Sequence, residues 1–144
     1  MRAFAIVVST AMAFALAPSP MAGQTTRVRT ILRESRASLV FVGKAGDVIR
    51  DYSLDGRGDG PEVTLNIQKL LRGKYSEQDI SFRFYGHWGF AKKSRIFFVT
   101  RDASTEHESS ECNEKPCYYY SSKWELPWSR KMEAMVRRVL LPTR

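Results

Sequence analysis

Residues 38–49 read SLVFVGKAGDVI, and this stretch contains the first strand that the sequence predicts. Its block Leu39-Val40-Phe41-Val42 joins β-branched, aromatic and leucine side chains without a polar break. Such residues favour a buried, pleated strand, so we predict a core strand here. Gly43 and Gly46 predict a bend or bulge, after which residues 48–49 continue the strand.

Further strands are predicted downstream of a loop at residues 51–61, which holds two Asp-Gly pairs. Residues 62–68 and 79–85 each alternate apolar and polar side chains, the pattern of a strand buried on one face. Residues 92–100 contain the apolar block IFFV, which predicts another core strand. The three tyrosines at residues 118–120 have the composition of a short strand.

Residues 102–114 differ from the rest of the chain. They hold five acidic residues and no basic one, and they are rich in serine, so we predict an exposed loop. Before them, the segment 69–74, KLLRGK, is expected to lead from the second strand into a turn at Gly73.

Two helices are predicted. Residues 29–37 place apolar side chains near helical spacing, which predicts a short N-terminal helix. Residues 128–141 predict a C-terminal helix, with Ser129 as its cap or Pro127 in its first turn. Its apolar face comprises Met132, Met135, Val136, Val139 and Leu140. Closely spaced strands followed by a helix predict a mainly β domain, a small barrel or sandwich with helical decoration.

The first 22 residues have the order of a secretory signal peptide. Met1-Arg2 is a positive start, residues 3–17 are an apolar run, and prolines and small residues follow. The run is shorter than the about 20 residues that span a bilayer. We predict cleavage after Ala22, which leaves a basic segment at 23–37 and a domain at 38–144. The mature chain is expected to be exported, periplasmic or secreted, without a transmembrane span.

The chain is strongly basic. Its net charge is +8 and its pI is near 9.8. Removal of residues 1–22 takes away one charged residue, Arg2, and leaves +7. A surplus of this kind favours anionic partners such as nucleic acid, anionic glycan or a lipid surface, and it also suits a plain soluble surface. Charged residues make up 26% of the chain, which excludes a membrane bundle.

Cys112 and Cys117 are the two cysteines of the chain. In an oxidising compartment we expect them to form a disulfide that staples a local loop. Their spacing lacks the tight paired pattern of zinc motifs, and no second pair exists, so no metal site is predicted.

Residues 37–100 resemble the core of the netrin-like domain family, which includes the N-terminal domains of tissue inhibitors of metalloproteinases and many secreted bacterial proteins. The matching segments are ASLVFVGK at 37–44, VTLNI at 63–67, KLLRG at 69–73 and RIFFV at 95–99. The resemblance implies an OB-like, five-stranded closed barrel with a C-terminal helix. It also implies a secreted protein-interaction module without catalysis.

The chain departs from that family at two places. Family members usually carry cysteines near the mature N-terminus and in the turn that Gly86-His87-Trp88-Gly89 occupies here. In the inhibitors, an N-terminal cysteine places its amine on the protease zinc. The expected N-terminus here is Gly23-Gln24, so no functional residue is carried over from the family.

No catalytic constellation is visible. The chain lacks Gly-x-Ser-x-Gly and a P-loop, and spacing does not pair His87 or His107 with a nucleophile. His107 lies between two glutamates, a pattern of a solvated acidic loop more often than of a metal site. Arg57-Gly58-Asp59 is the tripeptide that integrins read, and plain turn chemistry explains it better. We predict no enzyme, no cofactor and no metal.

Basic and aromatic residues are interleaved along the predicted strands, a mixture that OB-like barrels use to track a polyanion and stack rings on it. The alternative to the netrin-like module is therefore a binder of anionic polymer, with glycan favoured over nucleic acid because of export. We expect a monomer whose partner is a protein or such a polymer. The predicted binding residues are Lys69, Arg72, Lys74, Arg83, Tyr85, Trp88, Lys92, Lys93 and Arg95.

Overall fold

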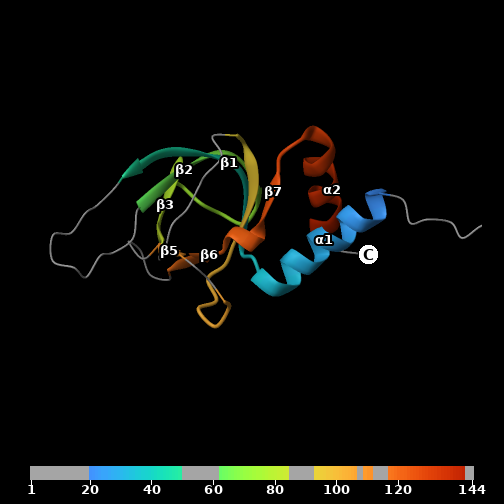
Figure 1. The fold of residues 1–144 in the computed structure, drawn as a ribbon, viewed down its shortest axis with the longest axis horizontal. Coiled ribbons are helices and arrows are strands. Elements are labelled where there is room, and N and C mark those ends of the chain that lie inside the picture. Colours follow the sequence, from blue (N-terminus) through green and yellow to red (C-terminus); the bar gives the residue numbers. More distant parts are fainter. Residues whose placement is uncertain (1–19, 50–61, 85–92, 107–108, 112–116, 142–144) are drawn as a thin grey trace, which may run out of the picture.

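The computed structural model describes residues 20–49, 62–84, 93–106, 109–111 and 117–141. A curled β-sheet forms one end of the molecule, and two helices pack side by side at the other (Figure 1). The elements are α1 (Pro20–Ser35), β1 (Leu39–Ile49), β2 (Glu62–Arg72), β3 (Asp79–Phe84), β4 (Arg95–Val99), β5 (Ser109–Glu111), β6 (Tyr118–Tyr120), the 3-10 helix η1 (Ser122–Trp124), β7 (Glu125–Pro127) and α2 (Arg130–Leu140).

The sheet is antiparallel throughout its described strands, in the order β6-β5-β3-β2-β1-β4-β7. It curls until β6 reaches the end of β4, where Thr100 bridges to Tyr119. The predicted mainly β, barrel-like class is confirmed. The strand number differs from the prediction, because seven strands are described where five were expected.

β1 and β4 separate two hydrophobic cores, and this explains their unbroken apolar sequences. Alternate residues of β1 point into the curled sheet or toward the helices, so both faces are buried, as in sheets covered on two sides. The barrel core comprises Leu39, Phe41, Val63, Leu65, Ile80, Phe82, Phe97, Val99, Tyr118 and Tyr120. The helical core comprises Val28, Ile31, Ala37, Val40, Val42, Ile96, Phe98, Trp124, Leu126, Met135 and Val136.

β2 and β3 have one buried face, as their alternation predicts. Val63 and Leu65 are buried, whereas the intervening Thr64 is partly exposed and Asn66 is exposed. The predicted bend in β1 is also present, since its register with β2 shifts between Val42 and Gly43 and again before Val48. The predicted turn at Gly73 is confirmed by its positive φ of 89°.

The two helices differ from their predictions mainly in extent. α1 begins at Pro20, nine residues before the predicted start at residue 29, and its first buried residue is Val28. α2 begins at Arg130 because the Ser129 hydroxyl accepts a hydrogen bond from the Met132 amide at 3.0 Å, which confirms Ser129 as the cap. Within the described residues, neither helix has the length and apolar character needed to cross a membrane.

A further sequence prediction is wrong, and others lie outside the described residues. The segment 102–114 is not entirely an exposed loop, because it contains β5, whose Glu111 is 7% exposed. β5 lacks an apolar pattern, and its pairing with β3 and β6 places it in the sheet. The structure does not describe Arg57-Gly58-Asp59, His87, His107 or Cys112. The disulfide between Cys112 and Cys117 therefore stays a prediction.

Candidate anionic-polymer interface

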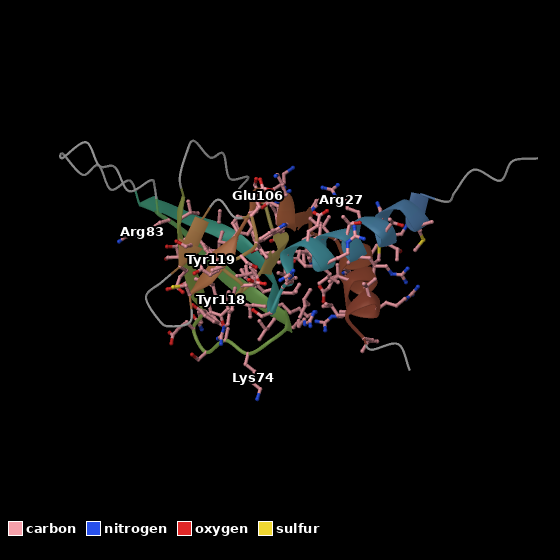
Figure 2. All side chains as sticks on the ribbon, turned by 90° about the horizontal axis from the view of Figure 1, so that it is seen from below. Arg27, Lys74, Arg83, Glu106, Tyr118 and Tyr119 are labelled. Carbon is pink, nitrogen blue, oxygen red and sulfur yellow. The ribbon has the colours of Figure 1, made fainter. Side chains whose placement is uncertain are left out.

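The predicted binding residues are spread over several parts of the molecule. Tyr85, Trp88 and Lys92 lie outside the described residues. In Figure 2, Arg83 lies at the far end of the curled sheet, whereas Lys74 extends into solvent from the turn after β2. The described members therefore do not gather on one basic-aromatic face of the barrel.

Lys69 and Arg95 point to opposite sides of the sheet. Lys69 pairs with Val42 in the β1–β2 register and reaches α2, where its Nζ lies 2.5 Å from Glu133 Oε1. Arg95 pairs with Gly43 and points the other way, where its Nε lies 2.6 Å from Glu125 Oε1. Both cations are thus held in ion pairs within the fold. Sequence spacing alone did not reveal these carboxylate partners, because α2 and β7 follow much later in the chain.

The helices carry the larger concentration of positive charge. α1 and α2 hold seven cationic and two anionic side chains, a net charge of +5, and the two helices are in contact. Every one of these cations is exposed, and among the described residues only Arg137 forms an ion pair. We call this set the helical cation surface; it comprises Arg27, Arg29, Arg33, Arg130, Lys131, Arg137 and Arg138.

Glu133 neutralises the part of this surface nearest the sheet. Its carboxylate is only 8% exposed and accepts from three donors: Lys69 at 2.5 Å, the Trp128 indole N–H at 3.1 Å and Arg137 Nε at 3.1 Å. The hydrogen bond from Lys69, then that from Trp128, lowers the pKa of Glu133 to about 2. Glu133 therefore stays ionised at neutral pH and acts as an internal counter-ion.

Trp128 presents a fixed aromatic face beside α2. Its side chain is 40% exposed, yet its orientation is set at both ends. The backbone amide donates to Ser94 O at 3.3 Å, and the indole N–H donates to Glu133. An exposed ring held in this way can stack on a sugar or a nucleobase at low entropic cost. The sequence led us to expect Trp88 in this role. Trp128 was not selected, because the search followed basic and aromatic residues along the predicted strands and Trp128 lies outside them.

The signal for the helical cation surface was present in the sequence in two separate parts. The arginines of α1 lie in the basic segment 23–37, and those of α2 lie opposite its apolar stripe. Helical spacing shows which residues of each helix face solvent. That the two helices pack together is a tertiary fact, visible only in the structure.

Comparison with protein-family models, with curated proteins and with solved structures finds no match to this chain. A functional assignment therefore rests on the chain's own residues and on their geometry.

Proposed function

We propose that the protein is an exported, non-catalytic binding domain that holds an anionic polymer on the helical cation surface. The observation that carries this proposal is the excess of seven exposed cations over two carboxylates on α1 and α2. One of those carboxylates, Glu133, is already occupied by Lys69, Trp128 and Arg137. Exposed cations that outnumber the nearby carboxylates attract a polyanion, which releases its counterions on binding.

The polymer class follows from export and from Trp128. An exported protein meets anionic glycans more often than nucleic acid, and the half-exposed indole suits stacking on a sugar ring. Cleavage after the predicted site, Ala22, would leave the packing of α1 intact. Met21 to Arg27 contribute no buried residue, and the packing of α1 begins at Val28. The mature chain would keep all seven cations.

A protein-interaction role of netrin-like type is the second candidate. It rests on the resemblance of residues 37–100 and on a curled antiparallel sheet followed by a C-terminal helix. The KLLRG segment ends β2 at the Gly73 turn, where the family places its lysine-glycine pattern. On this proposal β1 to β4 supply four strands of the five-stranded OB-like core, and one of the three-residue strands supplies the fifth.

The test is a titration of the purified protein with a sulfated glycan and with single-stranded DNA at several salt concentrations, followed by tryptophan emission. A variant with Arg130→Gln and Arg138→Gln removes two exposed charges from α2 without touching the core. The control, Lys44→Gln with Lys123→Gln, makes the same charge change on β1 and η1, outside the two α-helices.

We expect saturable binding that weakens steeply with salt. Each phosphate contact with single-stranded DNA makes the plot of log affinity against log salt steeper by about 0.7. The α2 variant loses two such contacts, so its plot should be shallower by about 1.4. The control should leave it unchanged. Equal slopes in both variants would contradict the helical site, and absent binding at low salt would favour the protein-interaction role.

A further inference from the structure

A small cleft opens where the start of β1, the turn after β2, the end of β4 and β6 come together. It has a volume of about 220 Å³ and is lined by Ser38, Lys74, Arg101 and Tyr118. These residues come from four segments: the α1–β1 junction, the turn after β2, the end of β4 and β6. Two of the four are cationic and the other two carry hydroxyl groups, so every lining side chain can donate a hydrogen bond.

The Tyr118 hydroxyl is positioned to donate into the cleft. Arg101 Nη2 donates to Tyr118 Oη at 2.5 Å, and the Arg101 guanidinium carbon lies 4.7 Å from the centre of the Tyr118 ring. The ring is only 6% exposed and Tyr75 packs edge-on against it at 5.8 Å. Because the oxygen accepts from a cation, its own proton is polarised and remains available for an acceptor.

No described carboxylate neutralises this cleft. Arg101 and Lys74 form no ion pair with any residue of the described segments. The neighbouring Asp102 is turned away: its Oδ2 accepts from Arg36 at 2.7 Å, and its Oδ1 accepts from the Ser104 amide and hydroxyl at 2.9 and 2.6 Å. Its carboxylate oxygens therefore have partners outside the cleft.

The turn that carries Lys74 is held against Ser38. Gly73 has a φ of 89°, and a Cβ at this position would lie 2.5 Å from Ser38 O. The absence of a side chain lets the turn approach the α1–β1 junction, which brings the base of Lys74 to the rim of the cleft. Figure 2 shows its ammonium extended into solvent, free to close over a bound group.

We propose that this cleft is a binding site for one oxyanion group, a carboxylate, sulfate or phosphate. Arg101 supplies guanidinium N–H donors, Tyr118 and Ser38 supply hydroxyl donors, and Lys74 closes the site as a second cation. The site does not use the helical cation surface and goes beyond the function proposed above. In Figure 2, Lys74 and Arg27 project on opposite sides of the molecule.

The experiment is an amide NMR titration of the purified protein with sodium sulfate, inorganic phosphate and acetate, with chloride keeping the ionic strength constant. The variants are Arg101→Gln, which removes the guanidinium, and Tyr118→Phe, which removes one oxygen and keeps the buried ring. The control is Lys123→Gln, which removes an exposed cation that lies on η1 and pairs with Glu106. Unchanged dispersion of the remaining amide signals confirms that each variant is folded.

We expect saturable shifts centred on residues 38, 74, 101 and 118, with affinity about tenfold weaker in both cleft variants and unchanged in the control. The anion with the tightest binding identifies the ligand class. Three results would overturn the proposal. The first is shifts that do not saturate, and the second is shifts that centre on α1 and α2. The third is an anion affinity in both Tyr118→Phe and Arg101→Gln that equals that of the unaltered protein. The Arg130→Gln, Arg138→Gln variant should bind the small anion normally, so failure of the polymer proposal would leave this site intact.

Discussion

Thr100 and Tyr119 exchange both backbone hydrogen bonds, with N–O distances of 3.0 Å from Thr100 N and 2.8 Å from Tyr119 N. The pair joins the end of β4 to β6, which stands at the opposite end of the strand order from β7. These two bonds hold the curled sheet together at this end and protect the barrel core beneath them.

Replacement of Tyr119 by proline should therefore loosen the closure. Proline removes the N–H that Thr100 O accepts, and we expect the free energy of unfolding to fall by about 2 kcal/mol. Urea unfolding measures the change, with Tyr119→Ala as the control because it keeps the amide. Fast hydrogen exchange of the Thr100 and Tyr119 amides in the unaltered protein would contradict this closure.

Two buried hydroxyls should respond in opposite ways. Ser35 is fully buried and its Oγ has no hydrogen-bond partner in the described part of the chain. Ser35→Ala should leave stability unchanged or raise it by up to about 1 kcal/mol. Thr100 Oγ1 instead donates to Arg36 O and accepts from the Asp102 amide. Thr100→Val should cost about 2 kcal/mol, measured by the same unfolding curves. A loss as large for Ser35→Ala as for Thr100→Val would show that Ser35 has a partner.

Glu133 should make stability depend on acid pH. Its pKa is lowered from 4.5 to about 2, so the stabilisation is fully present above pH 4.5 and is lost as pH falls toward 2. The difference in unfolding free energy between the unaltered protein and Glu133→Gln should be constant above pH 5 and shrink below 4.5. Asp102 titrates in the same range but is present in both proteins. A difference that stays constant down to pH 2 would exclude a lowered pKa for Glu133.

Trp128 should report on polymer binding. Trp128→Phe keeps an aromatic ring but removes the hydrogen bond to Glu133, whereas Trp128→Ala removes the stacking face as well. If the ring stacks on the polymer, alanine should weaken glycan affinity by about tenfold and phenylalanine by less. Fluorescence from the other tryptophans or calorimetry measures both. Equal affinity in all three proteins would remove Trp128 from the interface.

Gly73 should tolerate no side chain. Gly73→Ala forces a positive φ on an L-residue and places a methyl group against Ser38 O, so a loss of about 2 kcal/mol or more is expected. Gly46→Ala is the milder comparison, with its nearest contact at 3.2 Å and no positive φ. Equal melting temperatures for the two variants would contradict the close approach of Gly73 to Ser38.

The sequence was sufficient to predict elements whose side chains carry their own pattern. The apolar runs in β1 and β4, the alternation of β2 and β3, and the Ser129 cap each reflect local chemistry that survives in the fold. It was insufficient for β5 and β7, each three residues long, because pairing with neighbours far along the chain defines them. The early part of α1 is a similar case, since Gly23 and Thr25 are weak helix formers and docking begins only at Val28.

The candidate binding surfaces were harder to predict, because the sequence does not show which cations form ion pairs within the fold. Lys69 and Arg95 look alike in the sequence, yet each is neutralised by a carboxylate from a later element. Arg101 and Tyr118 were not selected at all, since their pairing depends on the curl that brings β6 to the end of β4. Tertiary packing decides which cations remain available.

The two-sided burial of β1 and β4 makes the C-terminal helix a cover for the sheet as well as the proposed binding element. Val40, Val42, Ile96 and Phe98 face it and α1, and no polar side chain separates them. Proteolytic trimming of α2 would uncover this apolar patch on strands that are otherwise intact. Such a surface invites self-association, so a shortened chain should precipitate or oligomerise while its barrel remains folded.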